Sequence, residues 1–430
     1  MRAGVIGRPR LGQFLGTAGR LYLDVGSHPE YATPEDTSAE ATTANQIAGE
    51  EIVQDTFEQG TARRHEDGSL RRDVELVVNK RLVGNDGITW GAHENYGVMR
   101  HKLSPDANRL ALLGFHMSTR NVYCGAGWLR PDGKYWVAQK PAGLNCDTAK
   151  NTTGSSKPVI NLRDEQEASY AYCRIHVTSG DANMSPWQIR MAIGTTALVI
   201  ALEEYGDHDP LTLDDKLLTT IRSVASDPTL EERYHIRVGR TPKVVSVIDA
   251  QREQLKLIKR YAKQISIDDE ASWTIEQWDK ALADLEQDPM LLADRVDWVA
   301  KLLMIRRLQE KTGYDLSHPK LRGIDILWGE LSKNGIGLKL RQQEWAQWMP
   351  SDIKERKEAP PQTTRAKMRG AFVLAYGSNE KLQPDNTNAK VDWKTCTYNT
   401  RTIKIDVPSQ TQSDAIDALI ACAPPLELVT

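Results

Sequence analysis

Residues 20 to 36 read R-L-Y-L-D-V-G-S-H-P-E-Y-A-T-P-E-D, and this stretch holds the most informative pattern in the chain. Its first four residues predict a short strand that ends at Asp24. Alternation along a strand places Tyr22 and Asp24 on one face and the two leucines on the other. A glycine and a proline then separate Asp24 from Glu30, so the turn can aim both carboxylates into one cleft.

Two carboxylates in one cleft suggest two different roles. Mg²⁺ prefers carboxylate oxygens and keeps open positions for phosphate groups, so one acid could hold a metal ion. The other acid could serve as a general base if it stays free of metal. On spacing alone, a strand and turn with solvated acids explains the pattern at least as well.

The composition is that of an ordinary soluble globular protein. The chain has 430 residues, of which 40% are hydrophobic and 26% charged, and its net charge is −3. This length allows one large core with an appendage, or about two to three domains. The small negative charge argues against nucleic acid as the main partner.

Cysteine usage and hydropathy favour the cytoplasm. The five cysteines are scattered and form no C-x-x-C pair, which argues against a zinc site or a disulfide framework. No run of about 18 apolar residues occurs, so we expect no membrane span. The basic N-terminal residues are not followed by an apolar segment long enough for a signal peptide. A reducing cytoplasm is therefore the expected location.

The order of predicted elements indicates an α+β fold, because strands are concentrated early in the chain and helices late. The predicted strands are residues 20–23, 73–79, 93–99, 157–163 and 172–178. The predicted helices are residues 43–58, 187–204, 244–264, 269–311 with a break at Asp288-Pro289, and 413–423.

A change in composition divides the chain near residue 355. The run K-E-R-K-E-A-P-P at residues 354–361 combines charge with two prolines, which predicts a linker or a domain edge. We therefore expect a large domain over residues 1–355 and a small C-terminal domain over residues 356–430.

A second polar motif, W-G-A-H-E-N-Y-G, occupies residues 90–97. On a strand, His93 and Asn95 lie on one face and Glu94 lies on the other. These three side chains could line a polar cleft. Ordinary surface structure is the commoner outcome for such a triplet.

Two further regions carry basic residues suited to an anion. Arg163 and His176 lie on strands predicted to be adjacent and could meet a polyphosphate, since arginine offers a fork of donors. Arg365 and Arg369 are four residues apart and would share one helix face. They either bind an anion or are ordinary surface charges. The sequence contains no Walker loop and no G-x-G-x-x-G motif.

Taken together, these motifs resemble the signature of Pup–protein ligases, in the family of Pup ligases and Pup deamidases. The stretch A-G-R-L-Y-L-D-V-G-S-H-P-E-Y-A-T resembles that signature nearly residue for residue. The motifs that follow in the family's order are H-E-N-Y, I-N-x-R-D-E, H-V-x-x-G-D-A-N-M-S, G-T-T-A-L-V, D-x-Q-R-E, L-S-H-P-K and P-P-Q-T-T-R-A. The resemblance extends from Gly19 to about Trp393 and so covers most of the chain.

The resemblance implies a glutamine synthetase-like fold. Its large domain carries a curved antiparallel sheet that holds ATP and Mg²⁺, with helices packed behind, and a small C-terminal domain completes the site. The implied reaction phosphorylates the C-terminal glutamate side chain of Pup, a small disordered protein modifier, or of a Pup-like protein. A lysine of a substrate protein then attacks the acyl phosphate and forms an isopeptide bond, which marks that protein for the bacterial proteasome.

The resemblance also implies roles for the acids of the first motif. Asp24 matches the family's catalytic aspartate, which would take the proton of the attacking lysine. An ammonium group must lose a proton before it attacks, so a nearby carboxylate is chemically required. Tyr22 and Glu30 match metal-binding positions, and we add His176 as a further candidate metal ligand.

The implied ATP-binding residues lie in several parts of the sequence. Arg20 and Thr33 match ATP-binding positions, and Trp393 matches a tryptophan of the small domain that could stack on adenine. We add Arg163 and Arg365 as candidate phosphate ligands, because arginine would offset charge on a transferred phosphoryl group.

Ligase activity is favoured over deamidase activity. The deamidases usually read Y-V-D-H-A-H-P-E-Y-S where this chain reads Y-L-D-V-G-S-H-P-E-Y-A-T, as ligases do. The chain also leaves no room upstream for the characteristic loop insertion of the deamidases.

The chain departs from the family at its beginning. Family members open with a strand whose glutamate binds metal, whereas here no acidic residue precedes Asp24, so we expect that strand to be absent. A late start codon, a fragment or a divergent, weakened enzyme would each explain this. The alternative functions are therefore a deamidase (a depupylase) or an inactive homologue that binds a Pup-like peptide.

Overall fold

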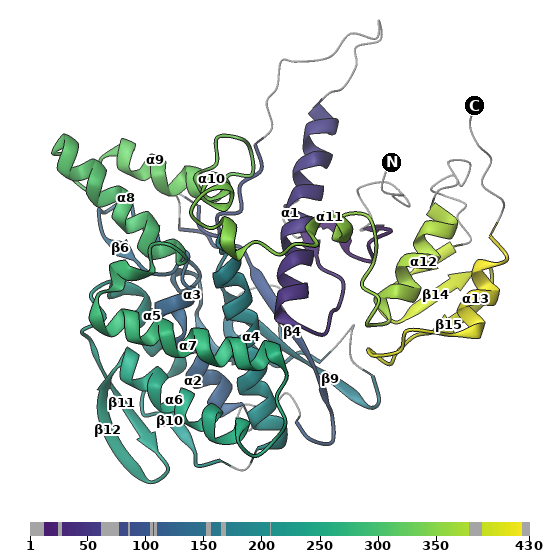
Figure 1. Ribbon diagram of the computed structural model, residues 1–430, viewed down its shortest axis with the longest axis horizontal. Helices are drawn as coiled ribbons and strands as arrows, with labels where there is room; N and C mark the ends of the chain where they lie inside the picture. Colours follow the sequence, from purple (N-terminus) through teal and green to yellow (C-terminus); the bar gives the residue numbers. More distant parts are fainter. Residues whose placement is uncertain are drawn as a thin grey trace, which may run out of the picture. The chain divides into compact units, whose positions relative to one another are not determined.

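Two compact units make up the chain (Figure 1). Unit 1 comprises residues 1–78, 166–169 and 350–430, and unit 2 comprises residues 79–165 and 170–349. The domain boundary expected near residue 355 stays a prediction. The structure, a computed structural model, describes residues 13–24, 28–61, 77–84, 87–103, 106, 110–151, 156–164, 169–206, 208–377 and 389–423.

A four-stranded sheet forms the framework of unit 2. In spatial order its strands are β4 (Ala92–Met99), β9 (Tyr172–Gly180), β8 (Pro158–Asn161) and β7 (Cys146–Ala149). β9 is antiparallel to both β4 and β8, while β7 and β8 are parallel. Cys173, Ile175 and Val177 of β9 belong to the hydrophobic core. Alternation therefore turns His176 to the opposite face of the sheet.

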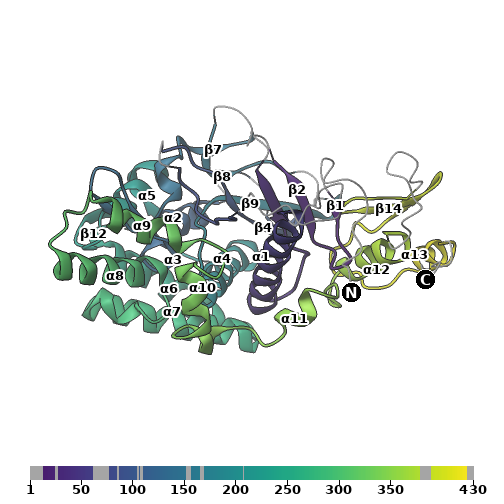
Figure 2. The ribbon, with the colours of Figure 1, turned by 90° about the horizontal axis from the view of Figure 1, so that it is seen from above.

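Helices cover the core face of this sheet (Figure 2). α2 (Ala111–Thr119) packs against β8, and α4 (Pro186–Tyr205) packs against β4. α6 (Val247–Ala262) and α7 (Asp269–Gln287) pack against α4. The other α-helices of the unit are α3 (Asn121–Cys124), α5 (Leu217–Ser226), α8 (Asp297–Thr312), α9 (Pro319–Trp328) and α10 (Ile336–Gln342).

Short strands and single-turn 3-10 helices complete unit 2. The strands are β5 (Trp128–Leu129), β6 (Tyr135–Trp136), β10 (Leu211–Leu213), β11 (Arg233–Val238) and β12 (Thr241–Ser246). The 3-10 helices are η2 (Lys140–Ala142), η3 (Pro289–Leu292) and η4 (Ala346–Trp348).

A buried histidine lies among the packed helices of unit 2. His116 of α2 is fully buried, and its ring nitrogens lie 2.7 Å from Gln254 Oε1 and 3.2 Å from Thr195 Oγ1. Burial, together with the positive charge of Arg120, lowers the pKa of His116 to about 3. His116 is therefore neutral at pH 7 and serves as a hydrogen-bonded core residue.

Unit 1 contains two small sheets. The first has the order β1 (Gln13–Phe14), β2 (Arg20–Leu23) and β3 (Pro29–Ala32), all antiparallel. The second has the order β13 (Ala389–Val391), β14 (Thr395–Tyr398) and β15 (Arg401–Lys404). The helices of unit 1 are α1 (Ala39–Thr61), α11 (Ile353–Arg356), α12 (Ala366–Gly377) and α13 (Asp414–Ile420).

The C-terminal sheet has a core of its own. Apolar residues of β13 and β14 pack with those of α12 and α13, including Met368, Phe372, Cys396, Ile416 and Leu419. Salt bridges from α11 to α1 join Lys357 to Glu51 and to Asp55 at 3.0 Å each. These contacts hold early and late segments of the chain within one unit.

The structure confirms most of the predicted elements and the α+β fold class. The strands at 20–23, 93–99, 157–163 and 172–178 and the helices at 43–58, 187–204 and 413–423 are present, with bounds that differ by a few residues. The helix expected over 269–311 is interrupted at Asp288-Pro289, as expected. Of the strand expected at 73–79, residues 73–76 lie outside the described residues.

One prediction about local structure was wrong. Residues 241–246 form strand β12, so the helix expected from residue 244 begins only at Val247. A capping box formed by Ser246 and Asp249 fixes that start. The linker or domain edge expected at 354–361 stays a prediction, although residues 354–356 belong to helix α11. The expected absence of the family's metal-binding opening strand stays a prediction, since β1 contains no acidic residue and residues 1–12 lie outside the described residues.

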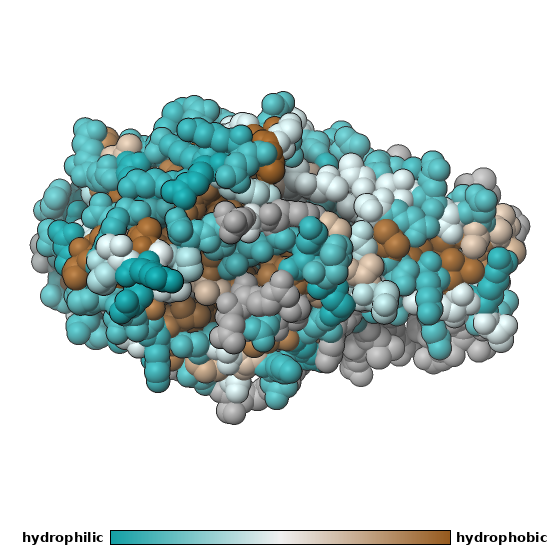
Figure 3. Space-filling model, turned by 90° about the horizontal axis from the view of Figure 1, so that it is seen from below, coloured by the Kyte–Doolittle hydropathy of each residue, from teal (hydrophilic) through white to brown (hydrophobic). Residues whose placement is uncertain are grey.

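Among the described residues on the face drawn in Figure 3, apolar side chains (brown) form separate small groups between hydrophilic ones. Among the described residues, no helix combines the length and apolarity needed to cross a bilayer.

Candidate active site

The hairpin of β2 and β3 places the predicted acidic residues together. Tyr22 and Glu30 are register partners, and the Tyr22 hydroxyl donates a hydrogen bond to the Glu30 carboxylate. Asp24 follows β2 and is exposed, and its backbone N–H donates to His28 O at 2.9 Å. The negative charge of Asp24 acts on both Tyr22 and Glu30. The predicted shared face of Tyr22 and Asp24 is thus present.

The electrostatics of this hairpin suit a bound cation. Burial and the nearby Glu30 carboxylate raise the pKa of the Tyr22 phenol. Burial also raises the pKa of Glu30, despite the hydrogen bond from Tyr22, and the charge of Asp24 raises it further. Excess negative charge in a partly buried place is stabilised by a cation. Mg²⁺ prefers such oxygen ligands, so these residues fit the metal that the sequence implies.

Tyr22 and Glu30 would supply only part of a metal coordination shell. The described part of the chain contains no group of three or more His, Cys, Asp or Glu side chains placed to hold a metal ion. Mg²⁺ commonly keeps waters and substrate phosphates as ligands, so two protein ligands are compatible with it. Tyr22 and Glu30 as metal ligands stay a prediction.

A row of aromatic and guanidinium groups extends from the hairpin to the C-terminal part of unit 1. The Arg20 guanidinium lies 4.9 Å from the centre of the Tyr22 ring and 5.6 Å from that of Phe14. The Phe14 ring meets Trp393 edge-on, with ring centres 5.0 Å apart. Arg20 and Trp393, two predicted ATP ligands, therefore contact the same phenylalanine from β1.

Arg20 has a buried donor that suits an anionic ligand. Its Nε atom is buried and has no hydrogen-bond partner among the described residues. A buried donor without a partner costs about 1–3 kcal/mol, and an oxygen of a bound phosphate would remove that cost. Thr33 follows β3 directly and is half-buried. ATP binding by Arg20, Thr33 and Trp393 stays a prediction.

Arg365 and Arg369 are not surface charges, so that interpretation was wrong. Their side chains are 1% and 0% exposed, and both bind the carboxylate of Glu35. Arg365 Nε donates to Glu35 Oε1 at 2.9 Å. Although burial opposes it, the guanidinium groups of Arg369 and Arg365 lower the pKa of Glu35 to about 2. The anion that these arginines bind here is a protein carboxylate, and Arg365 as an ATP ligand stays a prediction without support from this geometry.

In unit 2, the predicted histidines meet on one face of the sheet. Asn95 of β4 and His176 of β9 are register partners, and Asn95 Oδ1 lies 2.7 Å from His176 Nδ1. The His93 ring meets the His176 ring edge-on, with ring centres 5.1 Å apart. Both β4 residues thus lie on the His176 face, as alternation predicts.

Positive charge surrounds His176. Burial, followed by the nearby His93, Arg174 and Arg163, lowers the pKa of His176 to about 2. The ring is therefore neutral at pH 7 beside two guanidinium groups. This environment suits the polyphosphate contact expected for Arg163 and His176. A neutral imidazole could also bind a metal ion. Both roles stay predictions.

Glu94 points away from this face, as alternation predicts, so its place in the same cleft stays a prediction without support from this geometry. Its carboxylate forms an ion pair with the buried Arg120 and accepts a hydrogen bond from the Tyr96 hydroxyl at 2.6 Å. Arg120 also donates to Ala192 O at 2.9 Å and to Thr196 Oγ1 at 2.6 Å. Glu94 therefore joins β4 to α4 inside unit 2.

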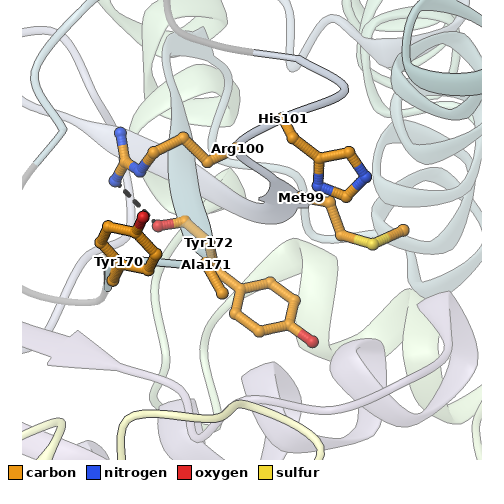
Figure 4. A pocket seen from close by; sticks show the side chains of 6 residues that line it. All are labelled: Met99, Arg100, His101, Tyr170, Ala171 and Tyr172. Carbon is orange, nitrogen blue, oxygen red and sulfur yellow. Dashed lines mark hydrogen bonds between the residues drawn. The ribbon is translucent and has the colours of Figure 1, made fainter.

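A pocket of about 490 Å³ lies at the other end of β4 and β9 (Figure 4). Its lining residues are Met99, Arg100, His101, Tyr170, Ala171 and Tyr172. Arg100 Nη2 donates to Tyr172 O at 2.9 Å, and Arg100 Nη1 pairs with Asp164 at 2.5 Å. None of the predicted site residues lines this pocket.

Comparison with known proteins identifies the family. Residues 7–397 match the model of the family described as Pup-ligase protein. The chain is 32% identical to the Pup–protein ligase of Acidimicrobium ferrooxidans over 420 residues, which are 95% of this chain and 89% of the relative. The chain belongs to the Pup ligase family.

Solved structures of the Pup ligase family agree with this fold. The structure resembles that of the Pup ligase PafA in complex with ADP, with a TM-score of 0.80, 25% identity and coverage of 98% of this chain and 90% of the other. It also resembles PafA in complex with the prokaryotic ubiquitin-like protein Pup, with a TM-score of 0.79, 25% identity and coverage of 95% and 83%. The glutamine synthetase-like α+β fold expected from the resemblance is confirmed.

Sequence reasoning missed two residues that organise unit 1 of this Pup ligase family member. Phe14 lies between Arg20 and Trp393, and Glu35 is bound by Arg365 and Arg369. Glu35 had a signal, because it stands at the end of the first motif beside a second acid. Phe14 had none, since an isolated phenylalanine gives no indication of its partners.

Proposed function

We propose that this chain is an ATP-dependent ligase that joins the C-terminal glutamate of Pup, or of a Pup-like modifier, to lysines of substrate proteins and so marks them for the bacterial proteasome. The observation that carries this proposal is the β2–β3 hairpin. Arg20, Tyr22 and Asp24 alternate onto one face there, with Glu30 as the register partner of Tyr22. Family membership and the ADP and Pup complexes of PafA support it.

The proposed reaction has two steps. A carboxylate oxygen of the modifier's glutamate attacks the γ-phosphorus of ATP, so that ADP leaves and an acyl phosphate forms. The lysine amine then attacks the acyl carbon, inorganic phosphate leaves, and an amide bond forms. Asp24 accepts the proton that the lysine ammonium must lose, which its exposed position after β2 allows.

The other predicted residues bind and orient in this scheme. Arg20 and Thr33 hold the phosphates of ATP, and Trp393 offers an indole face to adenine. Tyr22 and Glu30 would hold Mg²⁺, which when bound offsets the negative charge that develops on the transferred phosphoryl group. Arg163 and His176 of unit 2 are proposed as further anion contacts.

The test is a conjugation assay with purified Pup ending in glutamate, a lysine-bearing protein and ATP. Asp24→Asn should keep its affinity for ATP and lose roughly 10²- to 10⁴-fold in the rate of isopeptide formation, because an amide cannot accept the proton. Glu51→Gln, an exposed acid of α1 in the same unit, is the matched control and should conjugate at the parent rate. Conjugation by Asp24→Asn at the parent rate would show that Asp24 is not the base.

The same assay separates the alternatives. A deamidase would convert Pup ending in glutamine to Pup ending in glutamate and would not need a lysine acceptor. An inactive homologue would bind Pup and yield neither product. The relatives described above are ligases, which favours conjugation over both alternatives.

A further inference from the structure

Arg369 of α12 uses all of its donors on acceptors within unit 1. It is fully buried, although arginine is almost never buried without partners. Nη1 donates to Glu35 Oε1 and to Trp393 O, each at 3.2 Å. Nη2 donates to Glu35 Oε2 and, at 3.2 Å, to Ala18 O, while Nε donates to Ala18 O at 3.3 Å. A guanidinium has five N–H donors, so all of them are used.

The three acceptors of Arg369 lie on the segments that carry three of the predicted ATP ligands, Arg20, Thr33 and Trp393. Ala18 is two residues before Arg20, Glu35 is two residues after Thr33, and the third acceptor is the carbonyl of Trp393 itself. One rigid, planar group therefore connects segments that are far apart in the sequence.

The same guanidinium also contacts the aromatic rings beside these segments. It lies 4.9 Å from the centre of the Trp393 ring and 5.3 Å from that of Phe14. Cation–π contacts at such distances favour one ring orientation over others. The indole of Trp393 is thus held through both its backbone and its ring.

The backbone at Ala18 indicates that this contact is needed. Ala18 has φ +63° and is fully buried. A non-glycine residue in this conformation costs of order 1 kcal/mol and persists only where surrounding structure holds it. Two hydrogen bonds from Arg369 to the Ala18 carbonyl hold the turn that leads from β1 to Arg20.

We propose that Arg369, anchored by Glu35, is a positioning residue that fixes Arg20, Thr33 and Trp393 in the arrangement that binds ATP. This proposal rests on the proposed function, since it takes those three residues as the nucleotide contacts. With all five donors engaged inside the protein, Arg369 has none left for the nucleotide. It acts through the residues that it holds, and Glu35 keeps its charge compensated.

The test is the dissociation constant for ATP with Mg²⁺, measured by calorimetry, which requires no conjugation activity. Arg369→Lys keeps the charge but has three donors and no planar fork, so we expect ATP to bind roughly tenfold more weakly. Lys357→Gln is the matched control. Lys357 binds Glu51 and Asp55 of α1 at 3.0 Å each, outside the segments that carry Arg20, Thr33 and Trp393, so this variant should keep its affinity for ATP.

A double-mutant cycle with Trp393→Ala distinguishes positioning from a general loss of structure. If Arg369 acts partly through the indole, Arg369→Lys should weaken ATP binding less in the Trp393→Ala background than in the parent. Fully additive effects, or an Arg369→Lys affinity equal to that of the control, would overturn the proposal. A Trp393→Ala variant that binds ATP like the parent would overturn it as well.

The ring itself can be followed without any ligand. With 5-fluorotryptophan incorporated, the ¹⁹F resonance of Trp393, assigned from its loss in Trp393→Ala, should shift or broaden in Arg369→Lys and stay unchanged in Lys357→Gln. An unchanged resonance in both variants would refute the positioning role. Failure of the proposed function would appear separately, as a parent protein that binds ATP but forms no Pup conjugate.

Discussion

Breaking the ion pair between Glu94 and Arg120 tests whether the Glu94 face of β4 packs inside unit 2 or faces a ligand. The Arg120 side chain is 3% exposed and that of Glu94 is 15% exposed. The Glu94 carboxylate and the Tyr96 hydroxyl are joined by a 2.6 Å hydrogen bond. Glu94→Gln keeps the size of the side chain and removes its charge, so it isolates the ion pair.

The expected loss of stability follows from the burial of the arginine. Removing one partner of a buried pair costs about 3–5 kcal/mol, because the other charge stays buried without compensation. Glutamine keeps a carbonyl that can still accept from Tyr96, and Arg120 keeps its bonds to Ala192 O and Thr196 Oγ1. We therefore expect the lower end of that range, about 3 kcal/mol. For a unit of this size this corresponds to a fall of roughly 6–12 °C in Tm.

Two quantities are measured for each variant: the free energy of unfolding in urea, and the dissociation constant for ATP in the presence of Mg²⁺. Glu94→Gln should lower the free energy of unfolding by about 3 kcal/mol and leave ATP affinity at varied Mg²⁺ unchanged. Asn95→Ala, on the other face of the same strand, is the comparison and should cost only about 1 kcal/mol through its bond to His176. A Glu94→Gln variant with parental stability, or with ATP binding whose Mg²⁺ dependence is altered, would refute the packing role of Glu94 and indicate that it contacts the ligand.

Three further outcomes are expected. Trp393→Ala should weaken ATP binding by about 5- to 150-fold in calorimetry, since stacking of a base on an aromatic ring is worth roughly 1–3 kcal/mol. An unchanged affinity would show that adenine does not stack on the indole of Trp393. The pKa of Glu35 is lowered from 4.5 to about 2, so its contribution to stability is present above 4.5 and is lost as the pH falls toward 2. The destabilisation caused by Glu35→Gln in urea unfolding should therefore shrink between about pH 6 and about pH 3, and a constant difference would contradict it. The pKa of His116 is lowered from 6.5 to about 3, so between these two pH values only the unfolded chain binds the proton, and the free energy of unfolding decreases as the pH decreases. His116→Gln should reduce that slope, measured by urea unfolding at about pH 7 and about pH 5, and an unchanged slope would assign it to other groups.

The parts of the site that lie within one hairpin could be predicted from the sequence. Alternation along residues 20–24 was enough to place Tyr22 with Asp24, and the Gly/Pro turn was enough to return Glu30 to the same region. The same period separated His93 and Asn95 from Glu94. Such relations depend only on neighbours in the chain, so a pattern in the sequence reports them directly.

The parts that depend on distant partners could not be predicted. Arg369 and Glu35 are 334 positions apart, and no local pattern indicates that the arginine will pair with that carboxylate. Spacing alone placed Arg365 and Arg369 on a shared helix face and left their partner open. For Glu94, alternation gave the correct face, but only packing against α4 shows that this face is interior.

The error at residue 244 has a local cause. Helical spacing continued into Val244 and Val245, although β-branched residues also favour strands. Pairing with β11 decided between the two, because Val244 and Val245 face His235 and Tyr234 across the ladder. The capping box at Ser246 then begins the helix at Val247.

The two arginines that flank Phe14 show how one kind of side chain divides into two functions. Arg369 uses all five donors on protein acceptors, so a ligand can gain nothing from it directly. Arg20 keeps a buried Nε without a partner among the described residues. An unsatisfied buried donor lowers stability by about 1–3 kcal/mol, and a protein tolerates that cost most readily where a ligand removes it. In the proposed site, fixing Arg369 completely would keep Arg20 in place and available to bind a phosphate.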